Sequence, residues 1–300
     1  PEHFSAQVNR AAALAALNRV PEARQAYERA LQLKPDDAAT HSALGKLLAP
    51  ADAAAAEEHL RRAIALDPSV EDAPLALAEV LEARAAQGAG SLAEATAIYR
   101  EYLAAHPERG DLRLHLAGIY ISQKRFADAI PELEAARALE RPSFELNYTL
   151  LQAYVEGKSH DKALALLPEL LAQNEQDEEL HLILGSLRME KRQYREAAAA
   201  FRRATELEPN LTPGYTNLAS ALFLLKDYPG TVAALERVAA LGQDTAGTYF
   251  LRALALDQLG LKPGALENYQ RFLAAEGEKP ADQDFQARQR IRVLSREVRR

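Results

Sequence analysis

Residues 181–209, HLILGSLRMEKRQYREAAAAFRRATELEP, decide the fold of this 300-residue chain. The stretch places a leucine beside a small residue at Leu184 and Gly185, and later a small residue, Ala197, four positions before a large one, Phe201. Its apolar residues recur three, four and seven positions apart, which is the period of an amphipathic helix. A proline closes the stretch, and proline cannot continue a helix interior. The pattern therefore predicts two helices, a turn between them and a break after the second.

The pair of a small residue and a large residue four positions later recurs along the whole chain. The small residue returns at intervals of 33, 39, 34, 34, 34, 34 and 34 positions. A constant step of this size indicates an internal repeat whose units bury their apolar faces only against their neighbours. The pairs are Ala23 with Tyr27, Ala56 with Leu60, Ala95 with Tyr99, Ala129 with Leu133, Ala163 with Leu167, Ala197 with Phe201, Thr231 with Leu235 and Ala265 with Tyr269.

Residues 181–209 and the segment HSALGKLLAPADAAAAEEHLRRAIALDP at 41–68 resemble the tetratricopeptide repeat family, and the resemblance covers nearly the whole chain. It implies an all-α, right-handed superhelical solenoid of about eight helix–turn–helix repeats with a concave face. A tandem array is expected over residues 1–280. Its repeats are expected at 4–37, 38–70, 71–109, 110–143, 144–177, 178–211, 212–245 and 246–279.

Residues 281–300 predict one amphipathic helix that caps the array. Ala287, Ile291, Leu294 and Val298 fall at i, i+4, i+7 and i+11, so they would cover the exposed core of the last repeat. The other face is basic, either as a solvated face suited to a helix C-terminus or as a docking patch for an acidic or phosphorylated partner. Its arginines are Arg288, Arg290, Arg292, Arg296, Arg299 and Arg300.

Four features depart from the pattern. The third repeat carries about five extra residues around 87–91, whose glycines suggest a flexible loop. Leu151 stands where glycine or alanine is usual, although a large side chain there would push the two helices of a repeat apart. Arg252 takes a usual leucine position. Arg10 takes a normally apolar position in the first repeat, which suits an end cap or the remnant of a longer array.

Composition and motifs favour a protein without catalytic residues, metal or cofactor. The chain has no cysteine, which excludes disulfides, thiolate nucleophiles and cysteine-ligated metals. It has no phosphate-binding Gly-rich loop, no nucleophile elbow and no His-Glu-x-x-His pair. Its seven histidines lack ligand spacing, and His41 and His181 share one repeat position where packing explains them better than metal binding. No run of eighteen apolar residues exists, so no membrane span is expected.

The family resemblance places the concave groove on the first helix of each repeat. The transferred register predicts a lining that is acidic and apolar in the middle of the chain and more apolar toward its end. A helix or extended peptide with basic and apolar side chains would fit it, unless the acids are ordinary solvated helix surface. The clamp of lysines, asparagines and an arginine that relatives use for acidic chaperone tails is absent. The residues assigned to the groove are Glu79, Glu82, Leu114, Ile121, Tyr148, Glu156, Leu182, Met189, Asn217, Ser220, Phe223, Phe250 and Leu254.

The predicted function is a non-catalytic scaffold or adaptor that binds a peptide or helix of a partner protein in this groove. The alternative is the recruitment arm of a larger enzyme whose catalytic domain lies outside this chain. Nucleic-acid binding is disfavoured, because the net charge is −7 and the basic last helix lacks interleaved aromatic residues. A monomer is expected, since both ends of the array are able to close.

The style of the sequence, rich in alanine and arginine, suggests a bacterial protein. The chain begins with Pro1 and its only methionine is Met189, so we expect that its start has been removed. A signal peptidase or trimming of the chain explains this equally. Of the two compartments, export to the periplasm is slightly favoured over the cytoplasm.

Overall fold

The computed structural model describes residues 3–139 and 143–298. These residues form seventeen α-helices, and no strand occurs among them. The chain divides into two compact units, and the boundary between them in the sequence lies between residues 142 and 143. The fold is therefore an all-α helical repeat solenoid, as the sequence predicts.

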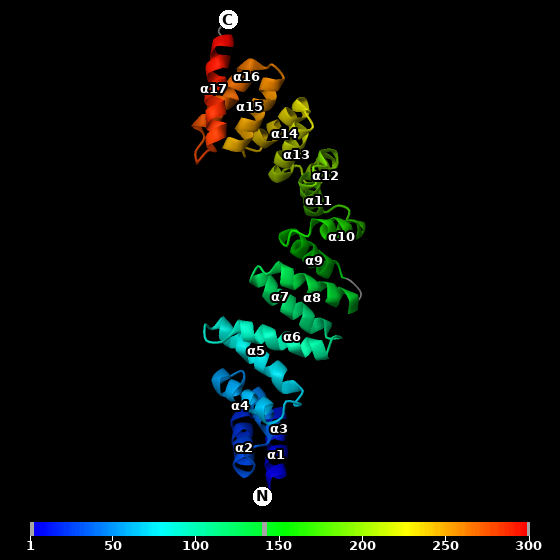
Figure 1. Ribbon diagram of the computed structural model, residues 1–300, viewed down its shortest axis with the longest axis vertical. Coiled ribbons are helices and arrows are strands. Elements are labelled where there is room, and N and C mark those ends of the chain that lie inside the picture. Colours follow the sequence, from blue (N-terminus) through cyan, green and yellow to red (C-terminus); the bar gives the residue numbers. More distant parts are fainter. Residues whose placement is uncertain (1–2, 140–142, 299–300) are drawn as a thin grey trace. The chain divides into compact units, whose positions relative to one another are not determined.

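The first unit consists of four helix pairs, in which each helix packs on the next one along the chain (Figure 1). Capping side chains fix where several of these helices begin, because they accept hydrogen bonds from otherwise unpaired backbone N–H groups. Asp37, Asp52 and Ser91 cap the third, fourth and sixth helices in this way. The helices are α1 (Phe4–Ala16), α2 (Val20–Leu33), α3 (Ala38–Leu48), α4 (Ala53–Leu66), α5 (Asp72–Ala86), α6 (Leu92–Ala105), α7 (Gly110–Ser122) and α8 (Phe126–Leu139).

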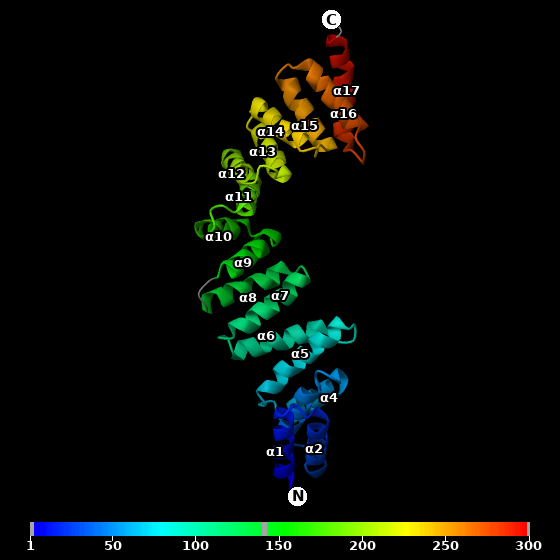
Figure 2. The ribbon, with the colours of Figure 1, turned by 180° about the vertical axis from the view of Figure 1, so that it is seen from behind.

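The second unit contains four further pairs and a single last helix (Figure 2). Ser143, Asp177, Asp227 and Thr245 cap helices here in the same manner. The helices are α9 (Phe144–Glu156), α10 (His160–Gln173), α11 (Glu178–Glu190), α12 (Tyr194–Leu207), α13 (Thr212–Leu224), α14 (Tyr228–Ala240), α15 (Ala246–Gln258), α16 (Lys262–Ala274) and α17 (Ala281–Glu297).

The small and large residues of the repeat pattern form the core of both units. All eight small residues, from Ala23 to Ala265, are fully buried, and no large partner is more than 5% exposed. Each pair lies on the second helix of its repeat and faces the first helix. The residues that carry the repeat pattern are therefore core residues.

Helix crossing explains the glycines of the pattern. A Cβ atom at Gly45 would lie 2.7 Å from Cγ of Leu60 on the paired helix, so no larger residue fits without a shift. Leu151 occupies the equivalent position in the fifth repeat and is fully buried. There α9 packs on α10 less extensively than the helices of the other pairs do. The sequence expectation that a large residue separates the helices agrees with this looser pairing.

The turn inside every repeat except the second contains a residue in the left-handed region of backbone space. Five of these residues are not glycine and have φ between 55° and 63°. Glycine takes the equivalent place at Gly88 and Gly260. Gly88 belongs to the insertion of the third repeat, which forms the connection between α5 and α6. The five residues are Asn18, Lys124, Lys158, Arg192 and Lys226.

The apolar face of α17 covers the core of the last repeat with three of the four residues expected. Ala287 and Leu294 of α17 are fully buried against the last repeat, and Ile291 packs beside them. Val298 lies beyond the end of α17 and is 41% exposed, so its assignment to the covering face is wrong. The reason is that α17 ends at Glu297, before the fourth residue of the predicted apolar face.

Two arginines of the basic face of α17 are paired with acids. Arg290 donates two hydrogen bonds of 2.6 Å to the carboxylate of Asp257 on α15. Arg288 pairs with Asp284 one turn earlier on the same helix. Arg290 therefore fastens the cap to the repeat instead of facing a partner. The predicted arginines at 299 and 300 lie outside the described residues.

Candidate functional site

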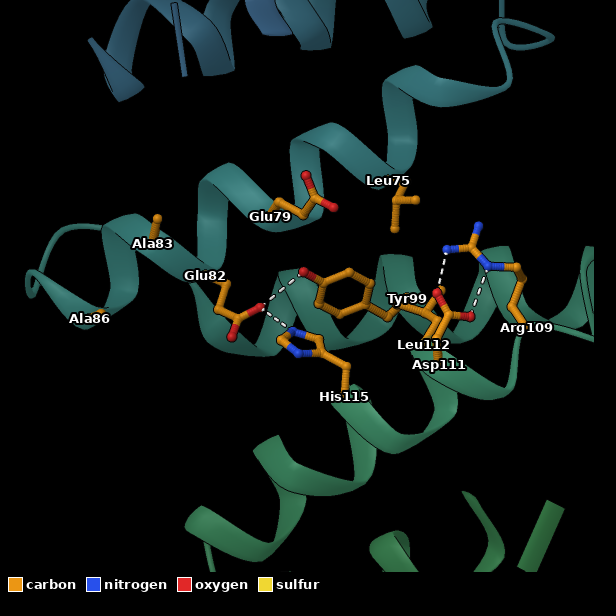
Figure 3. Close-up of a pocket in the computed structure, with 10 residues that line it drawn as sticks. All are labelled: Leu75, Glu79, Glu82, Ala83, Ala86, Tyr99, Arg109, Asp111, Leu112 and His115. Carbon is orange, nitrogen blue, oxygen red and sulfur yellow. Dashed lines mark hydrogen bonds and ion pairs between the residues drawn. The ribbon is translucent and has the colours of Figure 1, made fainter. Parts of the chain in front are cut away.

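A cavity of about 400 Å³ opens on one face of the first unit, between α5, α6 and α7 (Figure 3). Five of its residues come from α5, where they recur three or four positions apart and so share one face of the helix. Two of these are alanines, whose short side chains leave the space open. The lining consists of Leu75, Glu79, Glu82, Ala83, Ala86, Tyr99, Arg109, Asp111, Leu112 and His115.

Glu82 joins three helices at one end of this cavity (Figure 3). Its Oε2 accepts a hydrogen bond of 2.9 Å from the Tyr99 hydroxyl of α6 and lies 2.7 Å from Nε2 of His115 on α7. The rings of Tyr99 and His115 meet edge to face, with centroids 5.4 Å apart. Burial, and next the neighbouring carboxylate of Glu82, raise the pKa of Tyr99, so its hydroxyl stays a donor. The network therefore holds the Glu82 carboxylate in one position.

The other end of the cavity carries an ion pair and a free acid. Arg109 donates hydrogen bonds of 2.9 and 2.8 Å to the carboxylate of Asp111. These hydrogen bonds lower the pKa of Asp111 to about 2, so it is ionised throughout the neutral range. Glu79, between the two ends, forms no ion pair with any residue that the structure describes. Three carboxylates and one guanidinium thus line a cavity whose remaining walls are leucine, alanine, Tyr99 and His115.

Such an arrangement favours recognition of positive charge. Acids that line a concave, partly apolar surface attract cations, and the low-dielectric walls strengthen that field. Among the residues that the structure describes, no group of three or more possible metal ligands occurs. The cavity fits a long side chain with an apolar stem and a charged end, as lysine and arginine have.

Only two of the thirteen residues predicted for the groove, Glu79 and Glu82, line this cavity. Leu114 and Ile121 lie farther along α7 and outside it, the first of them 37% exposed. The other nine belong to the second unit. Their helices are α9 for Tyr148 and Glu156, α11 for Leu182 and Met189, α13 for Asn217, Ser220 and Phe223, and α15 for Phe250 and Leu254.

The second unit places several of these nine against its core. Leu182 and Met189 are half-buried and pack on the cluster that contains Phe201. Ser220 donates its hydroxyl to the backbone oxygen of Thr216, 3.0 Å away. Burial, together with the neighbouring Glu179, raises the pKa of Tyr148 to about 12. Glu156 is exposed.

Phe250 is wrongly assigned to the groove. Its side chain is only 7% exposed, and its ring lies 4.9 Å from that of Phe272 and 6.1 Å from that of Tyr269, measured between centroids. Leu254, one turn later, is half-buried in the same cluster. The ring belongs to the core because α16 covers this side of α15. Its register position alone does not distinguish the core from the edge of a groove.

Sequence reasoning missed Tyr99, Arg109 and His115 as members of one site. Tyr99 was assigned to the core, which its ring does occupy, but its hydroxyl reaches the first helix of the repeat. Tyr269 does the same toward Asp257, at 3.4 Å. A tyrosine at the large position together with an acid on the preceding helix is the signal that could have found this contact.

Comparisons with known proteins agree with this architecture. A family model described as TPR repeat matches residues 11–49, and two described as tetratricopeptide repeat match residues 86–138 and 120–187, and 178–211. The chain belongs to the tetratricopeptide repeat family. Proteins of this family are generally non-catalytic and bind protein partners, and this repeat chain is a protein-interaction scaffold. No helix in the described part of the chain is long and apolar enough to cross a membrane.

One curated relative is the cellulose synthase operon protein C of Xanthomonas axonopodis pv. citri (strain 306). It is 31% identical over 185 residues, which are 58% of this repeat chain and 12% of that protein. The chain thus matches about an eighth of the length of that relative.

Two solved structures show the same fold. A crystal structure of the MamA protein is 18% identical with a TM-score of 0.52, over 56% of this chain and 92% of that one. The structure of Naa15/Naa10 bound to HypK-THB is 14% identical with a TM-score of 0.72, over 90% of this chain and 42% of that one. At these identities the likeness concerns the fold alone.

Proposed function

We propose that this scaffold is non-catalytic and monomeric, and that it binds a peptide or helix of a partner protein through the cavity between α5, α6 and α7. The partner inserts a lysine or arginine whose charged end meets Glu79 and Glu82. The stem of that side chain lies on Leu75 and Leu112. An apolar neighbour in the partner continues along the same helix face toward Leu114.

The unpaired carboxylate of Glu79 is the observation that carries this proposal. Glu82 already accepts two contacts and Asp111 is neutralised by Arg109, whereas Glu79 has no such partner in the described part of the chain. A carboxylate at the edge of an apolar cavity gains most from an incoming cation, because both groups are partly removed from water when they pair.

A peptide array tests this proposal. The probes are synthetic peptides with two leucines around one central position, which is lysine, arginine, glutamine, glutamate or leucine. We expect the natural chain to retain the lysine and arginine peptides most strongly. Glu79→Gln should weaken that binding about two- to fivefold, because Glu79 is exposed and an exposed ion pair contributes up to about 1 kcal/mol. Glu276→Gln removes one exposed charge from the segment between α16 and α17 and serves as the matched control.

Two outcomes would contradict the proposal. One is equal retention of peptides with central lysine and central glutamate. The other is unchanged binding by Glu79→Gln, since this carboxylate makes no ion pair in the described structure whose loss could mask the effect. Circular dichroism at 222 nm shows whether each variant keeps its helices.

A second candidate is the recruitment arm of a larger enzyme. The match to a curated relative that is several times longer favours it, because repeat arrays can serve as one part of a long protein. The mass of the natural protein in its source cells tests this candidate. A product much longer than 300 residues with a separate catalytic domain would support it. A product of the length of this chain would rule it out.

A further inference from the structure

A second cavity, of about 590 Å³, opens on another face of the first unit. It lies between α4, the connection from α4 to α5, the start of α5, and α6. α5 turns a different face to it than to the cavity of Figure 3, because successive residues of a helix point about 100° apart. Its main lining residues are Ile64, Val70, Glu71, Pro74, Ile98 and Glu101.

One wall of this cavity is formed by a proline at a repeat position where the other repeats carry other residues, and the equivalent place in the second repeat, beside His41 and His59, is also open, with a volume of about 570 Å³. Four residues before the helix crossing, five other repeats carry a side chain that contacts the second helix of the same repeat. His41 contacts His59 at 3.0 Å, Arg113 pairs with Glu132 at 2.8 Å and Asn147 donates to Glu169 at 2.7 Å. Tyr215 and Tyr249 lie under Arg237 and Arg271. The third repeat has Pro74 at this position, whose short ring leaves the space beside Ile98 open.

The floor of this second cavity is apolar and held in place. Leu77 is buried at its base, and Ile64, Val70 and Ile98 are half-buried around it. Pro68 and Pro74 restrict the backbone of the wall. Such a surface binds an aliphatic or aromatic side chain at little ordering cost, because the pocket is formed in advance.

The rim of the second cavity carries an excess of negative charge. Arg61 donates hydrogen bonds of 2.7 and 2.9 Å to Glu94, and another of 2.9 Å to Glu57, so its charge is already balanced. Glu71 and Glu101 have no ion-pair partner among the residues that the structure describes. A ligand that is apolar at one end and positively charged beside it matches both the floor and the rim.

We propose that this cavity is a second docking site, which takes an aromatic or aliphatic side chain of a partner protein segment with a lysine or arginine beside it. The site is independent of the one under the proposed function, since the two cavities use different faces of α5 and α6. Both can be occupied at once. The third repeat then joins two partner segments, one on each face.

Methyl NMR of the full chain tests the second site. The probe is 2-phenylethylammonium, which joins an aromatic ring to a cation, and phenylacetate is the matched probe of opposite charge. We expect saturable shifts of the Ile64 and Ile98 methyl signals with the cation and a response weaker by about tenfold with the anion. Shifts at Leu75 and Leu112 would report the first cavity separately. Glu79→Gln should leave the Ile64 and Ile98 response unchanged.

Two substitutions at residue 74 make the test specific. Pro74→Tyr introduces the side chain that the seventh and eighth repeats carry at this position, so it should fill the cavity and abolish the shifts while the helices remain. Pro74→Ala removes the proline but leaves the cavity open, and it should retain binding. No saturable shift at Ile64 and Ile98, an equal response to phenylacetate, or full binding by a folded Pro74→Tyr variant would each overturn the proposal.

Discussion

A Cβ atom at Gly185 would lie 2.4 Å from Cε1 of Phe201, closer than packed carbon atoms approach one another. The backbone of α11 therefore rests directly on an aromatic ring of α12. Phe201 is 1% exposed and is surrounded by Ala198, Leu218 and Leu222. The ring has no free space on its other side into which it could retreat.

Gly185→Ala is expected to destabilise the second unit even though alanine favours helices. Overpacking costs about 1–3 kcal/mol, whereas the gain in helix propensity is about 1 kcal/mol. In a Phe201→Leu background the same change should become stabilising, since alanine faces leucine at Ala117 with Leu133. Urea denaturation of the four proteins of this double-mutant cycle measures the coupling. Additive effects of the two substitutions would show that the contact is not tight.

Arg290→Gln should loosen α17 from the last repeat. The bidentate contact to Asp257 is lost and leaves that carboxylate, whose side chain is 13% exposed, without its cation. Hydrogen bonds to charged groups contribute about 1.5–3 kcal/mol. Hydrogen exchange of the α17 amides should therefore accelerate. Arg288→Gln is the control and should leave exchange unchanged, because its ion pair lies on the helix surface.

Lys124→Gly should stabilise the first unit or leave its stability unchanged. Lys124 has φ of 57°, and a side chain costs about 1–2 kcal/mol in this conformation. Part of this gain is offset, because glycine makes the unfolded chain more flexible. Lys124→Val should be destabilising, since branching at Cβ aggravates the clash. Thermal denaturation of the two variants compares their stabilities. A Val variant as stable as the Gly variant would contradict the prediction.

The stability of the first unit should fall above pH 10. Burial raises the pKa of Tyr99 above its unfolded value of about 10. The unfolded state therefore loses this proton first, so the stabilising effect is fully present below pH 10 and declines as pH rises beyond it. Tyr99→Phe should cost about 1 kcal/mol at neutral pH through the lost hydrogen bond to Glu82. The substitution should also make the stability of the first unit fall less steeply as the pH rises. Thermal denaturation measured between pH 8 and 11 would test this.

The repeat pattern predicts the fold well, because the same spacing of a small residue and a large residue identifies the core pair in every repeat. Ala23 with Tyr27 and Ala265 with Tyr269, from opposite ends of the array, are equally buried. The assignment of Val298 to the covering face is wrong because the repeat pattern does not predict where α17 ends.

The candidate sites are predicted less well, since they depend on differences between repeats. Arg252, noted as an exception, is 7% exposed and binds Asp244 and the backbone oxygen of Leu235. Phe250 has the register of a groove residue but is covered by Phe272. Pro74 resembles an ordinary first-turn proline in the sequence, and its place in the wall of the second cavity becomes visible only in the structure.

The left-handed turn residues have a consequence for proteolysis. Lys124, Lys158 and Lys226 lie at exposed connections between two helices of a repeat. A lysine-specific protease acts on extended or irregular backbone, which these turns provide and helices do not. Brief digestion should thus cut the chain at sites whose separations are multiples of 34 residues. The lengths of the resulting fragments on a gel should reflect this spacing.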